Sequence, residues 1–173
     1  MRRRKGGVTL ELLINLPVWI IALLAIIEFG ELLSGLQQVS LAARVGAEEA
    51  SQTGAGSLST HDYDPVPSNI VEVIDHQLQS AGIVASASQR GVILEHNVGA
   101  SYVILASGTY PPPSGTPPPY LAGPALPTMG HFVRITVFVR MTRVVPNLLG
   151  SWGYDASGRF VWQMATFRYE LLL

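Results

Sequence analysis

The sequence predicts an α+β protein, in which a long N-terminal membrane-spanning helix continues into a small domain with one short helix and an antiparallel sheet of about four strands. Three features of the sequence predict this class. An uncharged apolar run lies near the N-terminus, helical spacing of apolar residues continues beyond it, and later segments alternate between apolar and polar residues. The 173 residues are enough for one anchor and one modest domain.

The apolar run covers residues 12–27, and Asn15 is its only polar side chain. Extending the run back to Gly6 adds a single charge, Glu11. At about 1.5 Å per residue this longer stretch measures roughly 33 Å as a helix, which matches a bilayer core of about 30 Å. We therefore expect one membrane span, with Glu11 inside the bilayer or at its edge.

Four consecutive basic residues, 2–5, precede the apolar run. Because Lys and Arg accumulate on the cytoplasmic side, they predict a cytoplasmic N-terminus and an extracytoplasmic remainder. A removable secretory signal is disfavoured, because no small-x-small cleavage site closely follows Ile27. The expected organisation is a basic leader at 1–6, a transmembrane helix at 7–28, its extramembrane continuation at 29–53, and an α+β domain at 54–173 with a Pro-rich loop at 107–128.

Glu11 is the most informative residue of the anchor, because a carboxylate at bilayer depth is costly and is by default a functional candidate. A partner for it arises if the chain is cut between Gly6 and Gly7. Gly7 would then carry a new α-amino group, which is largely cationic at neutral pH because its pKa is about 7.7–8.0. In an assembly, this amine of one subunit can neutralise Glu11 of its neighbour and set the register between them.

These residues resemble a known family. A basic leader, a glycine, four residues, a glutamate and an apolar helix form the prepilin-peptidase pattern of type IV pilin-like proteins. More specifically, the N-terminal region resembles TadE-like pseudopilins (minor pilins) of the tight-adherence, or Flp, pilus system. The residues that carry this resemblance are Glu11, Leu16-Pro17, Ile27-Glu28-Phe29-Gly30 and Ala43-Arg44-Val45-Gly46-Ala47. The segment from 137 to 170 resembles the closing strands of that family, whereas Leu12 departs from its usual Phe or Tyr.

The resemblance implies a non-catalytic, pilin-like protein that takes part in pilus assembly and needs no cofactor. It implies cleavage between Gly6 and Gly7, and assembly contacts through Glu11, Glu28, Phe29 and Gly30. The implied partners are the membrane, a prepilin peptidase, the tight-adherence inner-membrane platform, and the major pilin or sister pseudopilins. The implied location is the cytoplasmic (inner) membrane, which the chain crosses once, with the C-terminal domain outside the cytoplasm. Incorporation of the chain into a surface pilus is one fate that the resemblance allows.

Helical spacing continues past the span, so one helix is expected from about Val8 to Ser51, with Pro17 inside it. Its second half carries small residues at helical spacing, including Ala43, Gly46 and Ala47. These residues predict close helix packing, either against the protein's own sheet, which we favour, or against another subunit. Glu28 has two interpretations, as a marker of the membrane edge or as an assembly residue.

The remaining elements follow from local patterns. A short amphipathic helix is expected to begin at Ser68 or Asn69 and to end at Gly82. Residues 92–96 and 102–106 predict a hairpin, and the alternation over 131–145 predicts a half-buried strand ended by Pro146. Residues 159–172 predict the returning strand, in which Arg168 and Glu170 share a face and can pair with arginines of the previous strand. Eight prolines in 107–128 predict a stiff, solvated connection.

Composition argues against several other functions. There is no Cys, and the only Lys is Lys5, so neither a Cys-based metal site nor a basic nucleic-acid face is predicted. His61, Asp62 and Asp64 are interpreted as a solvated turn rather than as metal ligands. No catalytic motif is present, and Glu95 and His96, as neighbours in a strand, face opposite sides. The alternatives to a pseudopilin are an uncleaved single-pass protein with an extracytoplasmic binding domain and, less favoured, a tethered enzyme.

Overall fold

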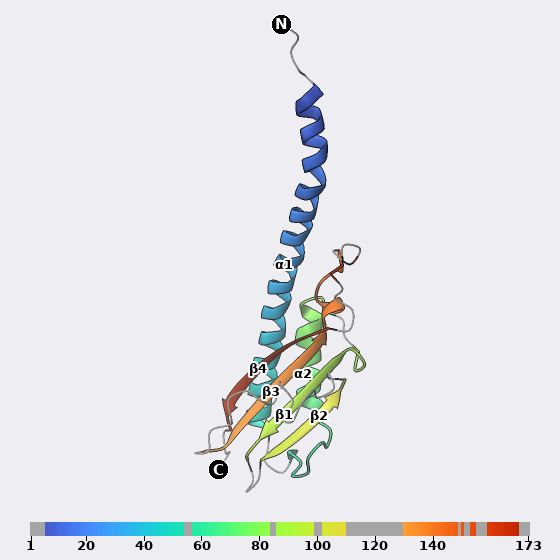
Figure 1. The fold of residues 1–173 in the computed structure, drawn as a ribbon. Coiled ribbons are helices and arrows are strands. Elements are labelled where there is room, and N and C mark those ends of the chain that lie inside the picture. The colour runs from blue at the N-terminus through green and yellow to red at the C-terminus, as the bar shows by residue number, and fades with distance from the viewer. Residues whose placement is uncertain are drawn as a thin grey trace.

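The computed structural model describes residues 6–53, 57–83, 86–98, 102–109, 130–148, 150, 153–154 and 159–169, with side chains from residue 11 onward. It is α+β, as the sequence predicts. One long helix projects from a small domain that contains a second helix and a four-stranded antiparallel sheet (Figure 1).

Helix α1 is a single helix from Gly6 to Gln52, and Pro17 lies inside it. Its N-terminal half projects away from the domain, whereas its C-terminal half lies against α2, β3 and β4 (Figure 1). The two halves differ in burial for this reason. Large apolar side chains before residue 28 are mostly exposed, whereas Val39, Ala43 and Ala47 are completely buried.

Helix α2 runs from Ser68 to Ser80 and buries Ile70, Ile74 and Leu78, which recur every four residues. It ends at a glycine in the left-handed conformation, Gly82, with φ of 78°. The next residue, Ile83, donates its backbone N–H to the Leu78 carbonyl at 2.9 Å, which closes the last turn. The predicted end of this helix at Gly82 is therefore confirmed.

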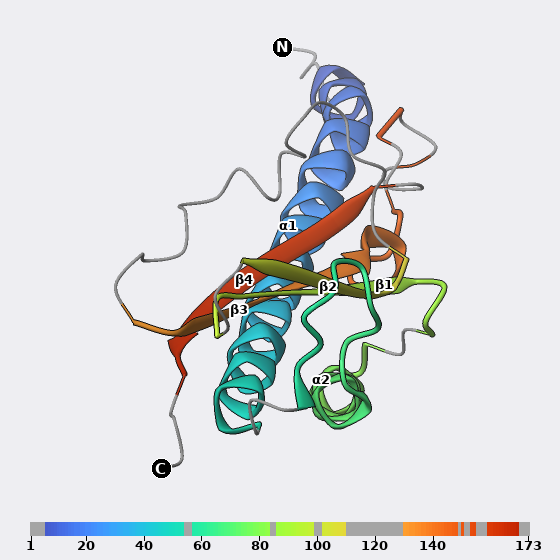
Figure 2. The ribbon, with the colours of Figure 1, turned by 90° about the horizontal axis from the view of Figure 1, so that it is seen from below.

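The sheet has the strand order β2-β1-β3-β4, and all neighbouring strands are antiparallel. Its strands are β1 (Arg90–His96), β2 (Val103–Gly108), β3 (Phe132–Arg140) and β4 (Phe160–Arg168). β1 and β2 form the predicted hairpin. β3 then pairs with β1 on the other side, so the chain crosses the sheet between β2 and β3. Helices α1 and α2 lie side by side on one face of the sheet (Figure 2).

The main core lies between these helices and the inner face of the sheet. Small residues of α1 allow the close approach: a Cβ added to Gly46 would lie 2.6 Å from Ile74 Cγ1. Ala43 and Ala47 are fully buried in the same seam. These small residues therefore serve the contact with the protein's own domain, the interpretation favoured from the sequence.

Several strand boundaries differ from the prediction: β1 begins at Arg90 rather than at residue 92, and β4 ends at Arg168 rather than at residue 172. β3 ends at Arg140 rather than Val145, because residues 141–143 form a 3-10 turn, η2 (Met141–Arg143). In this turn the Met141 carbonyl accepts hydrogen bonds from the backbone N–H groups of Val144 and Val145, both at 2.9 Å. β2 continues to Gly108, so the connection predicted from residue 107 begins later; residues 110–129 lie outside the described part of the chain.

The outer face of the central strands β1 and β3 also differs from the prediction, because it is buried rather than solvated. Arg134 and Thr136 are 3% and 1% exposed, although the alternation of β3 predicts a wet face for them. Phe138 is fully buried beside Ile93 on the same face, and its ring lies 6.5 Å from that of Trp162. The predicted partner Glu170 lies outside the described residues, and among the described ones Arg134 instead pairs with a carboxylate of β1.

Candidate interaction surface of helix α1

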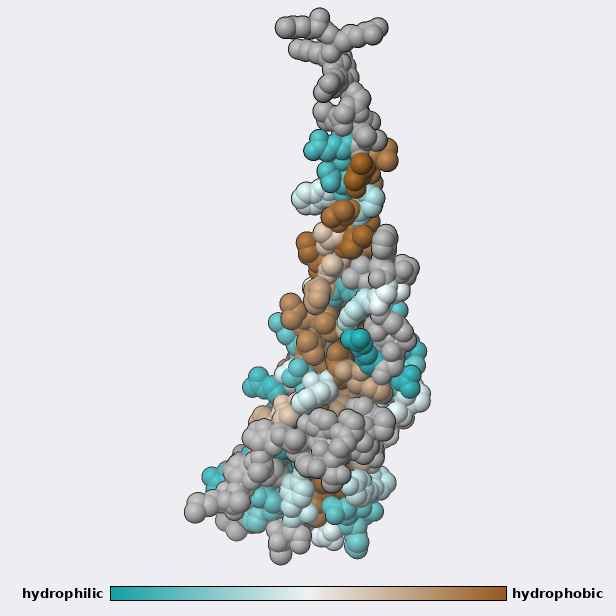
Figure 3. Space-filling view, in the orientation of Figure 1, coloured by the Kyte–Doolittle hydropathy of each residue, from teal (hydrophilic) through white to brown (hydrophobic). Residues whose placement is uncertain are grey.

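The N-terminal half of α1 is long and apolar enough to cross a membrane, and almost none of its apolar surface is covered by the domain. Trp19 is 75% exposed and Ile26 is 73% exposed. Contiguous apolar surface on this scale marks a membrane or protein contact rather than a solvated helix. In the space-filling view, the uncovered part of the helix is dominated by hydrophobic residues (Figure 3).

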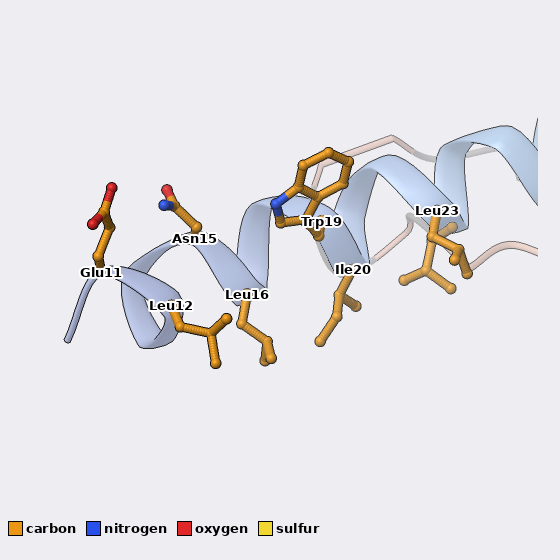
Figure 4. A pocket seen from close by; sticks show the side chains of 8 residues that line it. Glu11, Leu12, Asn15, Leu16, Trp19, Ile20 and Leu23 are labelled. Atoms are coloured by element: carbon orange, nitrogen blue, oxygen red, sulfur yellow. The ribbon is translucent and has the colours of Figure 1, made fainter. Parts of the chain in front are cut away.

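A shallow groove runs along one face of this exposed half. Glu11, Asn15 and Trp19 follow one another at four-residue spacing, so they share one side of the helix. In Figure 4 these three side chains point to one side, whereas Leu12, Leu16 and Ile20 point to the other. The groove lining consists of Glu11, Leu12, Asn15, Leu16, Trp19, Ile20, Leu23 and Leu24.

The chemistry of this face suits a second helix. A carboxylate, a carboxamide and an indole N–H supply both acceptors and donors, and in a bilayer there is little water to satisfy them. The leucines and Ile20 beside them supply apolar packing surface. Among the described side chains of the exposed apolar half of α1, Glu11 is the only charged one, and it lies on this face.

Glu28 differs from Glu11, although both were considered as assembly residues. Glu28 is only 4% exposed, and it lines a small pocket between α1 and the domain together with Met141 and Tyr154. Phe29, by contrast, is 63% exposed, and no atom lies within 4 Å of a Cβ added to Gly30. Phe29 and Gly30 therefore remain accessible on the outer side of α1, whereas Glu28 faces the protein's own domain and is shielded there.

The other residues named from the sequence are placed as follows. Gly6 begins α1, Gly7 lies in its first turn, and residues 1–5 are outside the described part of the chain. Pro17 is exposed on the projecting half of the helix, while Ala43, Gly46 and Ala47 are buried against the domain. The structure therefore separates α1 into an exposed half that carries Glu11 and a packed half that carries the small residues.

One packing residue was missed in the sequence. A Cβ at Gly35 would overlap the side chain of Val144, so Gly35 allows the segment after β3 to lie directly on α1. The available signal was a glycine inside a long helix, where glycine is unfavourable by roughly 1 kcal/mol relative to alanine. Such a residue in a helix interior often marks a close approach of backbone.

A buried polar cluster lies on the outer face of the sheet, away from α1. Glu95 of β1 lies opposite Arg134 of β3, and their nearest charged atoms are 3.5 Å apart. The Tyr102 hydroxyl donates a hydrogen bond to Glu95 Oε1, and Arg134 Nε donates one to Thr166 Oγ1 at 3.2 Å. Burial and the neighbouring Glu95 raise the pKa of Tyr102. The hydroxyl therefore stays protonated as the donor.

His96 lies next to Glu95 but points to the opposite face, as expected for neighbours in a strand. Its Nε2 lies 3.0 Å from the Ser59 carbonyl, and burial lowers the pKa of the imidazole. His61, Asp62 and Asp64 lie in a turn, in which the Asp62 carboxylate accepts a hydrogen bond from the Ile104 backbone N–H at 2.9 Å. Among the described residues, no cluster of three metal-ligating side chains is formed.

Comparisons of the chain with protein-family models, with curated proteins and with solved structures returned no match.

Proposed function

We propose that the protein is a membrane-anchored pseudopilin or minor pilin that takes part, without catalysis, in assembling a tight-adherence type pilus. The observation that carries the proposal is the division of α1 into a half fixed to the domain and an exposed apolar half that carries Glu11. A lone chain has no need of a carboxylate in an otherwise apolar span. A subunit that must recognise a neighbour within the membrane does.

In this proposal a prepilin peptidase cuts between Gly6 and Gly7, and the new amino group of one subunit pairs with Glu11 of the next. In this proposal the pair is intermolecular, because it joins the amine of one subunit to Glu11 of the next. Neutralising both charges removes much of their cost in lipid. The pair also sets the axial register between neighbouring helices.

The partners are then those that the resemblance implies. The peptidase acts on the leader, the tight-adherence inner-membrane platform receives the anchored chain, and the major pilin or sister pseudopilins supply the adjacent helices. The N-terminus lies in the cytoplasm and the α+β domain outside the cytoplasmic membrane. The groove along Asn15, Leu16 and Trp19 is where the neighbouring helix packs.

We expect Glu11→Gln to abolish helix–helix contact without affecting membrane insertion, because Gln keeps the shape and removes the charge. Since the chain has no Cys, Leu16→Cys provides a unique cross-linking site in the groove. Oxidative cross-linking of Leu16→Cys to cysteine-bearing pilin helices in native membranes should fall at least tenfold in the Glu11→Gln background. Extraction with alkaline carbonate should show that both proteins remain in the membrane.

The matched control is Glu31→Gln, which removes an exposed carboxylate of α1 beyond the apolar run. It should leave the cross-links unchanged. Equal cross-linking with and without Glu11 would instead favour the uncleaved single-pass protein with an extracytoplasmic binding domain, in which Glu11 is replaceable.

A further inference from the structure

The end of the domain nearest the exposed half of α1 carries exposed arginines. β3 ends there, η2 follows, and β4 begins there (Figure 1). Arg140, Arg143 and Arg159 are all exposed at this end, together with Leu148, which is 38% exposed. We call these four residues the membrane-proximal rim.

No described carboxylate neutralises the rim. Two other domain arginines are bound to acids: Arg90 makes a two-pronged contact of 2.5 Å with Asp75, and Arg134 pairs with Glu95. The rim arginines have no ion pair among the described residues. Instead, the Arg140 guanidinium lies 5.7 Å from the Phe160 ring centroid, and that of Arg159 lies 5.3 Å from the Tyr154 ring centroid.

Stacking on a ring orients a guanidinium while leaving its N–H groups available, which is how arginine binds phosphate. The opposite end of the domain carries both signs of charge, because the exposed Glu48 and Asp62 lie there together with the exposed Arg168 at the end of β4. The rim is therefore a local group of three exposed guanidinium groups at the end of the domain from which the apolar half of α1 projects.

The rim also lies at the level of a bilayer surface. Met141 and Tyr154 line one pocket with Glu28, the residue that ends the uncharged run, and Val144 packs on Gly35. Gly35 lies seven residues after Glu28, which corresponds to about 10 Å along the helix. The headgroup layer is about 5–8 Å thick on each side of the core, and the Debye length is about 8 Å at physiological salt.

We propose that the membrane-proximal rim binds the anionic phospholipid headgroups of the bilayer that holds α1. The three guanidinium groups contact headgroup phosphates, and Leu148 enters the interfacial layer beside them. The domain would then be held at a defined tilt on the membrane, whether or not the leader is removed. Each basic residue close to an anionic surface strengthens such binding about fivefold.

The proposal is tested with the full chain in vesicles that contain a small fraction of lipid with a nitroxide on its headgroup. Thr142 is exposed in η2, so Thr142→Cys places a unique fluorophore next to Arg143. In vesicles with about a third phosphatidylglycerol, we expect nitroxide quenching at least twofold stronger than in phosphatidylcholine vesicles. The excess should disappear when salt is raised from 0.05 to 0.5 M, because surface charges are then screened.

Replacing all three rim arginines by Gln should abolish the dependence on anionic lipid, and Arg143→Gln alone should reduce it. The matched control is Arg44→Gln, because Arg44 is exposed on α1 but lies about 24 Å beyond Glu28. Equal quenching in both lipids would overturn the proposal, as would quenching that the rim substitutions leave unchanged. If the triple variant does not fold, the salt titration of the unsubstituted chain tests the proposal instead. Loss of the excess quenching at high salt would support binding to anionic headgroups, and unchanged quenching would overturn it.

Discussion

Replacing Glu95 with Leu is expected to lower the free energy of unfolding of the domain by about 3–5 kcal/mol. Both side chains of the Glu95–Arg134 pair are at most 4% exposed. Removal of the carboxylate would leave a buried guanidinium without this counter-charge. It would also deprive the Tyr102 hydroxyl of the acceptor that it has in the native cluster. The loss of stability is large because the substitution leaves a charge buried without its partner, whereas breaking an ion pair at the surface costs little.

Urea unfolding of the full chain in mild detergent, followed by tryptophan fluorescence, measures this effect. Removing both partners in a Glu95→Leu, Arg134→Leu double variant should recover most of the lost stability, because no buried charge then remains. The matched control is Glu72→Gln on the exposed side of α2, which should change stability by less than about 0.5 kcal/mol. A Glu95→Leu variant as stable as the native chain would show that the pair is not a structural requirement.

Replacing Gly46 with Val is expected to destabilise the domain by about 2–3 kcal/mol, the upper part of the range for overpacked cores. The first added carbon alone would lie 2.6 Å from Ile74 Cγ1, and Ile74 is fully buried and cannot move away freely. Helix α2 would have to shift from α1. The same unfolding measurement should show the loss, with Trp162 of the sheet as the reporter.

Gly30→Val is the matched control for this substitution, because Gly30 lies in the same helix with no atom within 4 Å of an added Cβ. Valine has a higher helix propensity than glycine, so stability should stay constant or rise slightly. Equal losses at positions 46 and 30 would mean that backbone effects, and not the α1–α2 contact, determine the result.

The fold class was predictable because its signals are local. Helical spacing located α1 and α2, and the two short apolar runs at 92–96 and 102–106 located the hairpin of β1 and β2. The end of β3 was not predictable in this way, because Met141 and Val145 are buried whether the chain continues as a strand or turns. A pattern of apolar residues indicates which side chains are buried, but it does not distinguish a continuing strand from a turn.

The buried outer face and the position of Glu28 depend on contacts between distant residues. Arg134 appears polar and solvent-facing in its own strand, and its burial makes sense only once the register with Glu95 is known. Glu28 likewise marks the end of an apolar run in the sequence, but it is buried and lines a pocket with Met141 and Tyr154, more than 110 residues later. Glu11 needed no such contact to be noticed, because its local surroundings alone make it unusual.

The central claim is that Glu11 is tolerated in the membrane because cleavage after Gly6 gives a neighbouring subunit the amine that neutralises it. N-terminal sequencing of the mature protein, isolated from the membranes of its own cells, tests this claim most directly. The account predicts a first residue of Gly7. A mature chain that still begins at Met1 or Arg2 would contradict it, because no new amine would then exist beside Glu11.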